Sequence, residues 1–185
     1  MTRIAVVTGN PKPQSRTHSV ARAVADAIAA GLGAEPARRR GRPERPGRPG
    51  RLEIDLAEHA AGLFDWSDPA LTRLTDEVAG SDIAIFASPT YKASYTGMLK
   101  AFLDRYGSNG LAGVAAVPVM TGGWPGHLLA VEVHLRPVLV ELAATVPSRG
   151  LYVTEPELAD LGAAVAKWSA AAIPLIVHSW HNPGA

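Results

Sequence analysis

The chain has 185 residues, of which 47% are hydrophobic and 19% are charged, and its formal net charge is +1. This balance is typical of a single globular domain over residues 1–185, and the small net charge gives no reason to expect a nucleic acid or a membrane as partner. The chain has no cysteine, which excludes disulfides and thiolate chemistry and fits a cytoplasmic location. No uninterrupted apolar run reaches the roughly 20 residues that cross a bilayer.

Predicted strands and helices alternate along the chain. Apolar runs predict strands, as does the alternation of apolar and polar residues at 52–56, and apolar residues spaced three or four apart predict helices. We expect strands at residues 4–8, 52–56, 83–87, 114–120 and 151–153. We expect helices at about 17–33, 70–79 (with Pro69 first after an Asp68 cap), 97–106 and 127–142, and from 158 until Pro174 ends or bends the last one. The alternation predicts an α/β fold: a flavodoxin-like, doubly wound, five-stranded parallel sheet of order 2-1-3-4-5 with helices on both faces.

Two segments depart from regular structure. Residues 36–51 are rich in arginine, proline and glycine, so they bury too little apolar surface to become ordered, and we expect a flexible insertion. The alternative is a basic arm for phosphate, nucleic acid or an acidic partner, but this stretch has no aromatic residue for base stacking. Pro137 lies inside the helix at 127–142 and removes a hydrogen bond to the carbonyl of Val133, which predicts a kink or a π-bulge there.

The loop from Gly9 to Thr17 follows the first strand and leads into a helix. Free amides at a helix N-terminus favour an anion, and Ser15, Thr17 and Arg16 add hydroxyls and a positive charge. These features suit a phosphate monoester, although the loop has neither the Walker nor the dinucleotide-binding glycine pattern. The alternative is that Ser15 or Thr17 only caps the helix.

Two further loops leave strands at the same sheet edge. Pro89, Thr90 and Tyr91 could line a flat aromatic ring, with Tyr91 or Tyr95 stacking on it; alternatively, Tyr95 packs on the helix and Lys92 is solvated. After the fourth strand, Gly122 and Gly123 would let the backbone approach a planar ligand closely, and the next residue, Trp124, could shield it.

The sequence contains no recognisable acid–base machinery. His127 stands alone at the start of a helix, where it more often caps or packs. His178 and His181 have a spacing that allows metal binding on a helix, but Pro174 and Pro183 indicate a loose tail, and we expect no metal site. A phosphate loop beside an aromatic slot therefore points to a cofactor that carries the chemistry itself.

Three stretches carry a family resemblance. Residues 9–17 resemble the G-S-P-x-x-x-S-x-[ST] phosphate loop of the NAD(P)H-dependent FMN reductases, with Asn10 in place of the usual serine. Residues 88–100 look like that family's S-P-x-Y-x-x-S-x-x-G-x-L-K signature. Residues 121–123 with 127–131 and 135–139 are similar to the branch that supplies reduced flavin to two-component alkanesulfonate monooxygenases. The insertion at 36–51 is not part of the family pattern.

The resemblance implies a site for FMN and for NADPH or NADH. Hydride would pass directly between the two rings without a catalytic residue, and reduced FMN would go to a monooxygenase or to oxygen. The helix at 127–142 would join subunits of a homodimer or homotetramer. The implied flavin-binding residues are Asn10, Gln14, Ser15, Arg16 and Thr17 near the phosphate, Pro89, Thr90, Tyr91 and Lys92 along the ribityl chain and ring, and Thr121, Gly122, Gly123 and His127 around the ring.

Two other readings stay open. FMN could remain tightly bound and pass electrons to a quinone, an azo dye or a metal oxyanion. Alternatively, the protein could be a flavodoxin-like FMN-binding protein that does not oxidise NAD(P)H.

Overall fold

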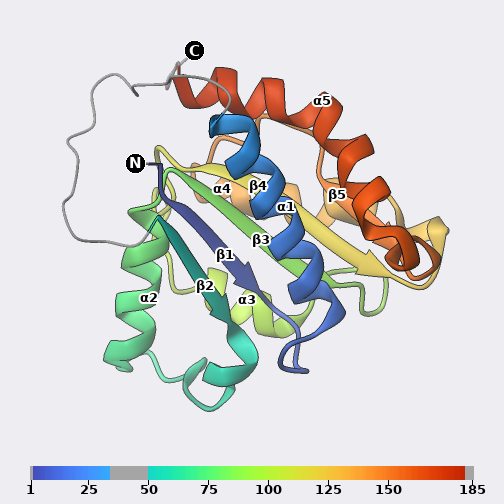
Figure 1. The fold of residues 1–185 in the computed structure, drawn as a ribbon. Coiled ribbons are helices and arrows are strands. Elements are labelled where there is room, and N and C mark those ends of the chain that lie inside the picture. Colours follow the sequence, from blue (N-terminus) through green and yellow to red (C-terminus); the bar gives the residue numbers. More distant parts are fainter. Residues whose placement is uncertain (1, 34–49, 182–185) are drawn as a thin grey trace.

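The computed structural model describes residues 2–33 and 50–181, apart from the side chain of residue 181. The strands are β1 (Ile4–Thr8), β2 (Arg51–Asp55), β3 (Ile83–Pro89), β4 (Ala115–Gly122) and β5 (Leu151–Thr154). They form one parallel sheet of order β2-β1-β3-β4-β5, and their arrows run in the same direction in Figure 1. This confirms the predicted flavodoxin-like order. The carboxyl ends of β1 and β3, which lie side by side, are the switch point where such sheets bind ligands.

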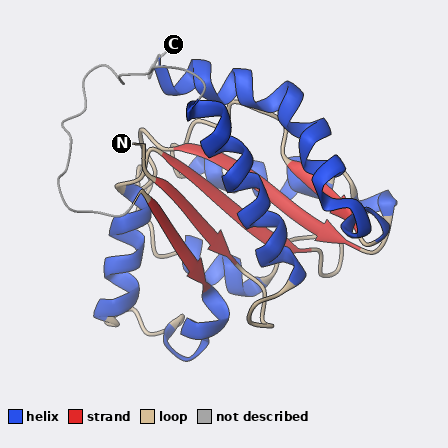
Figure 2. Cartoon of the chain, in the orientation of Figure 1, coloured by secondary structure: helices blue, strands red, loops and turns tan. Residues whose placement is uncertain are grey.

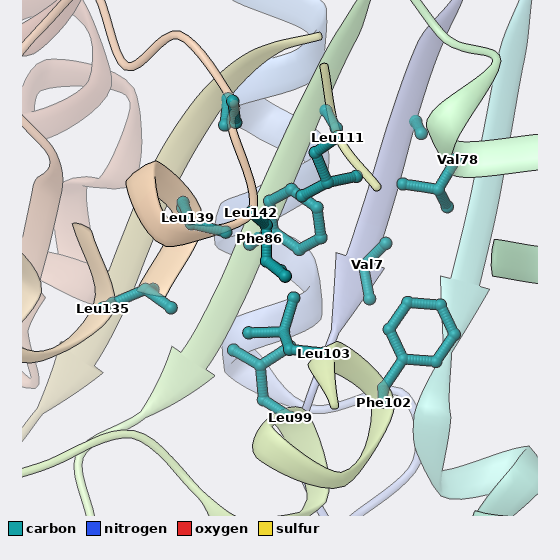
Figure 3. Packing of buried hydrophobic residues seen from close by; sticks show 14 of the residues in the cluster. Val7, Val78, Phe86, Leu99, Phe102, Leu103, Leu111, Leu135, Leu139 and Leu142 are labelled. Atoms are coloured by element: carbon teal, nitrogen blue, oxygen red, sulfur yellow. The ribbon is translucent and has the colours of Figure 1, made fainter. Parts of the chain in front are cut away.

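The helices cover both faces of the sheet (Figure 2). Helices α1 (Arg16–Gly33) and α5 (Leu161–His181) lie on one face; α2 (Pro69–Ala79), α3 (Gly97–Leu103) and α4 (Arg136–Glu141) lie on the other. Strand residues alternate between these faces, so Val6 packs with α1 and α5, whereas Val7 and Phe86 pack with α2, α3 and α4 (Figure 3). Burial on both faces explains the continuous apolar runs of the central strands.

Several element ends differ from the sequence-based expectation. Arg51 begins β2 and pairs with Asp26 and, at 2.8 Å, with Glu53, so it belongs to the strand and not to the insertion. Residues 36–49 of that insertion lie outside the described residues. Asp68 caps α2 through the amides of Ala70 and Leu71, as predicted.

Helix α3 is shorter than the predicted 97–106. It ends at Leu103, because the next amides form tighter turns: the Arg105 N–H donates to Phe102 O at 3.3 Å and the Tyr106 N–H to Leu103 O at 3.2 Å.

The predicted helix at 127–142 is broken into three pieces. A short 3₁₀ turn (Pro125–His127) precedes a π-helical turn (Val131–Leu135), and α4 follows. The Arg136 N–H donates to the carbonyl of Val131, five residues back, which is the π pattern. The structure thus confirms a π-bulge over a simple kink. Leu128, which follows the 3₁₀ turn, is 48% exposed.

Helix α5 continues through Pro174 to His181, so Pro174 does not end the helix, and the loose tail expected there is helical as far as residue 181. Both Pro174 and Ala170, whose carbonyl loses its partner, are exposed, so water can satisfy that group. Ala172, Ile176 and Trp180 hold the helix on the core.

The helical stretch Pro156–Trp180 is also apolar and long enough to cross a membrane by length and composition, which apolar runs alone did not reveal. One such helix is weak evidence, and this one packs along α1.

Candidate flavin site

A cavity of about 400 Å³ opens at the carboxyl edge of the sheet, above the ends of β1, β3, β4 and β5. It falls in the usual range for small-molecule sites, about 300–1,000 Å³. The predicted site residues that line it come from all three loops, joined by Lys12, Glu155 and Leu158, which sequence reasoning had not assigned. Lys92 and His127 are not among its lining residues. The predicted residues in the lining are Asn10, Gln14, Ser15, Arg16, Thr17, Pro89, Thr90, Tyr91, Thr121, Gly122 and Gly123.

The loop before α1 is held in a fixed shape by its own polar contacts. The Gln14 N–H donates to Oδ2 of Asp55 at 2.8 Å, and Gln14 has a positive φ of 50°. The Lys12 N–H donates to Oδ1 of Asn10 at 3.0 Å. The Ser15 hydroxyl accepts a hydrogen bond from the His18 N–H at 3.2 Å, so Ser15 does cap the first turn of α1. Because a hydroxyl also has a donor, this cap leaves Ser15 able to donate to an anion.

Buried hydroxyls connect this loop to the end of β4. Thr17 and Thr121 are 2% and 7% exposed, and their Oγ1 atoms lie 2.7 Å apart. Asn10 Nδ2 donates to Thr17 Oγ1 at 3.2 Å, and the Thr90 N–H donates to the Thr121 carbonyl at 2.7 Å. The three loops therefore form one connected polar floor.

The loop after β3 forms a tight turn from Tyr91 to Ser94. The backbones of these two residues exchange hydrogen bonds of 2.8 and 3.1 Å. The central residues Lys92 and Ala93 have φ angles of 51° and 64°, the pattern of a type I′ turn. Tyr91 remains 53% exposed at the cavity, which leaves its ring available for stacking. Tyr95 instead packs against the core beside α3, and burial raises the pKa of its hydroxyl.

Gly122 lies against the side chain of Tyr152. A Cβ on Gly122 would lie 2.1 Å from the Tyr152 hydroxyl oxygen and 3.2 Å from Thr90 Oγ1. Tyr152 is only 8% exposed, and its hydroxyl oxygen lies 3.3 Å from Thr90 Oγ1. The close approach of β4 to β5 here therefore requires glycine. The rings of Trp124 and His127 contact each other edge to face with their centroids 4.8 Å apart, and neither residue lines the cavity.

The charges of the cavity include an ion pair at its mouth. Arg16 Nη1 lies 2.5 Å from Oε1 of Glu155, the residue directly after β5. Two residues further on, hydrogen bonds from the Thr154 hydroxyl and amide lower the pKa of Glu157 and turn its carboxylate toward β5. Among residues 2–33 and 50–181, no cluster of metal-ligating side chains is found.

The family follows from a comparison with known sequences. A family model described as NADPH-dependent FMN reductase matches residues 2–157. The chain belongs to this family. That result confirms the resemblance drawn from the three loops.

Named relatives agree with this assignment. FMN reductase (NADPH) of Escherichia coli (strain K12) is 38% identical over 95 residues, which cover 51% of this chain and 50% of the relative. NADH-dependent FMN reductase SfnF of Pseudomonas putida is 29% identical over 160 residues, which cover 82% of this chain and 77% of the relative. The matches to the two FMN reductases (NADPH) of E. coli and of P. putida strain KT2440 span about half the length of those relatives.

Solved structures show the same fold. The apo form of an NADH:FMN oxidoreductase superposes with a TM-score of 0.70 at 29% identity, covering 92% of this chain and 89% of that one. An oxidoreductase from Corynebacterium diphtheriae gives a TM-score of 0.76 at 27% identity, covering 96% and 98%.

Proposed function

We propose that the protein is an NAD(P)H-dependent FMN reductase that binds FMN in the cavity at the carboxyl edge. The observation that carries this proposal is the position of the cavity. Three loops that are distant in sequence meet at the switch point of the sheet. They contribute a capped helix start, a turn with an exposed tyrosine and a pair of glycines. Family membership makes FMN the first ligand to test.

The donors of the cavity fit a phosphate monoester at one end. Arg16 and Lys12 supply positive charge, and the hydroxyls of Ser15 and Thr17 lie beside them at the start of α1. The dipole of this 18-residue helix adds positive potential at the same end. We infer that these residues hold the flavin phosphate.

The other end of the cavity fits a planar ring. Pro89, Thr90 and Tyr91 form one wall, and Thr121, Gly122 and Gly123 form the wall beside it, because β3 and β4 pair Pro89 with Thr121. The Thr90–Thr121 backbone bond of 2.7 Å fixes the two walls relative to each other. Bound FMN would supply the hydride-accepting ring, and the chain's contribution is to orient it and leave one face open to the nicotinamide. Among the titratable side chains that line the cavity, the ion pair is that of Arg16 with Glu155.

The segment around the π turn supports the proposed subunit interface. Leu129 and Val133 are 60% and 57% exposed, and Val140 on α4 is 53% exposed. Trp124, five residues before Leu129, is 61% exposed. We propose that a second copy of the chain covers these side chains.

Delivery of reduced FMN to a two-component monooxygenase rests on the resemblance of residues 121–139, and the cytoplasmic location remains a prediction.

Steady-state oxidation of NADPH and of NADH, with FMN titrated into flavin-free protein, tests the function. A rate that requires added FMN and saturates with it supports a reductase that uses FMN as substrate. Flavin that copurifies, together with a rate insensitive to added FMN, would favour the flavoenzyme that reduces quinone, azo or metal-oxyanion acceptors. No oxidation of either nucleotide would favour a flavodoxin-like binding protein.

A further inference from the structure

The ion pair at the cavity mouth joins two distant parts of the chain. Arg16 opens α1 and Glu155 follows β5, 139 residues later, and both line the cavity. Their side chains are 70% and 58% exposed, so the pair can open without disturbing the core. Arg16 is thus held by a carboxylate in the very cavity where the proposed function needs it for a phosphate.

The position of the Glu155 carboxylate is set by a fixed backbone. The Glu155 N–H donates to the Gly122 carbonyl at 3.0 Å, and its own carbonyl accepts from the Leu158 N–H at 3.3 Å. A Cβ placed on Gly123 would lie 3.7 Å from Glu155 Oε2. The carboxylate therefore lies between the phosphate loop and the glycine pair, and its side chain can turn away while the backbone stays in place.

We propose that Glu155 competes with the flavin phosphate for Arg16, and thereby weakens FMN binding and speeds FMN release. This inference rests on the proposed function, with FMN in this cavity and its phosphate near Arg16. A carboxylate and a phosphate accept the same guanidinium hydrogen bonds, so Arg16 cannot give its best geometry to both. A phosphate monoester carries between one and two negative charges at neutral pH and wins the competition, but the displaced carboxylate stays nearby and repels it.

This competition gives Glu155 a role in choosing between substrate and cofactor. A reductase that hands on its reduced flavin must let it leave after each turnover, whereas a flavoenzyme keeps it. An acidic group that re-forms its pair with Arg16 as the phosphate leaves stabilises the emptied cavity. Glu155 is therefore a positioning residue that keeps FMN exchangeable.

The Glu155→Gln variant removes the charge and keeps the size of the side chain. Removal of the carboxylate charge ends both the competition for Arg16 and the repulsion of the phosphate, so FMN should bind more tightly. Because exposed charges interact weakly in water, we expect the gain in affinity to be only about three- to tenfold. Quenching of flavin fluorescence on titration of flavin-free protein measures this affinity, and dilution of the complex measures the slower release. Riboflavin, which lacks the phosphate, should bind the variant and the wild type equally.

Three further comparisons make the result specific. Glu77→Gln removes one negative charge from α2, away from the cavity lining, and should leave the FMN affinity unchanged. In an Arg16→Gln background, Glu155→Gln should gain less than it does beside Arg16, because the competition has been removed. Glu155→Ala should tighten FMN binding in the same direction as Glu155→Gln.

The outcomes that contradict the proposal differ from those that contradict the function. Wild-type protein that binds FMN, with equal or weaker binding by Glu155→Gln, would overturn the role of Glu155 and leave the proposed function intact. An equal gain with and without Arg16, or an equal gain for riboflavin, would also overturn it. Wild-type protein that binds no FMN would overturn the proposed function and this inference together.

Discussion

The backbone N–H of Gln14 donates to Oδ2 of Asp55 at 2.8 Å, which ties the loop before α1 to the carboxyl end of β2. Asp55 is only 8% exposed, and its other carboxylate oxygen accepts from the Ala57 N–H at 3.2 Å. Gln14 has a φ of 50°, a conformation that costs free energy in a non-glycine residue. The carboxylate therefore compensates for an unfavourable backbone conformation at the point where we expect the flavin phosphate to bind.

We expect Asp55→Ala to lower both stability and FMN affinity. Loss of a buried, charged acceptor leaves the Gln14 N–H without its partner, which should cost about 1–3 kcal/mol of unfolding free energy. Thermal unfolding and FMN titration measure the two effects, and Asp55→Asn, which keeps an acceptor oxygen, should recover part of each. Tighter FMN binding by Asp55→Ala would show instead that the carboxylate acts mainly by repelling the phosphate.

Gly122→Ala should destabilise the protein by about 1–3 kcal/mol, because the new methyl group overlaps the Tyr152 hydroxyl. The cost should shrink when the same change is made in a Tyr152→Phe background, since the nearest remaining ring atom lies 3.0 Å from the new Cβ. Urea unfolding of the four proteins in this cycle measures the coupling. Equal costs in both backgrounds would exclude the hydroxyl as the cause.

Ala93→Gly should stabilise the protein by about 0.5–1 kcal/mol, because glycine adopts the positive φ of this turn without strain. Ala170→Gly is the matched control, since it places glycine at an exposed position inside α5, where it should cost about 1 kcal/mol. Chemical unfolding gives both values. A destabilised Ala93→Gly protein would mean that the turn tolerates alanine without strain.

Arg136→Ala should destabilise the π turn and the chain that leads into β5. Arg136 Nε lies 2.6 Å from Glu132 Oε2, and its guanidinium also donates to the carbonyls of Val146, at 2.9 Å, and Ser148. Glu132 Oε1 in turn accepts from the Gly150 N–H at 2.6 Å. Removal of the guanidinium leaves these acceptors unpaired, at a cost of about 2–3 kcal/mol.

Thermal unfolding followed by circular dichroism measures that loss for Arg136→Ala. Lys100→Ala is a suitable control, because it also removes a cation from an i,i+4 pair, here an exposed one with Asp104, the residue after α3. That change should cost less than about 1 kcal/mol. Similar losses for the two variants would contradict a special role for the contacts of Arg136.

The sequence was most informative where a signal is local. Apolar runs located four strands, an alternation of apolar and polar residues located β2, and the Asp68-Pro69 pair located the start of α2. Pro137 predicted an irregular turn near Val133, but the missing amide is compatible with a kink or a bulge, and only the Arg136–Val131 hydrogen bond distinguishes them. Helix α5 continues through Pro174 because Pro174 and Ala170 lie on its exposed side, where water can satisfy the free carbonyl. Which side of a helix is exposed depends on tertiary packing, and a local sequence pattern does not encode it.

The residues missed at the site act across the sheet. Asp55 contacts a loop 41 residues earlier, and Glu155 contacts an arginine 139 residues earlier. Their side chains meet the loop only because β2 and β5 end at the same edge. The order 2-1-3-4-5 was the one signal that could have found them, since it places the residue after every strand near the ligand.

A crystal structure of the protein with FMN tests the central claim most directly. We predict that the flavin phosphate lies at the start of α1, within hydrogen-bond distance of Ser15, Arg16 or Thr17, with the ring between residues 89–91 and 121–123. Flavin bound instead in the groove between the π turn and α5, which is lined by Val131 and Trp168, would contradict the assignment of the site.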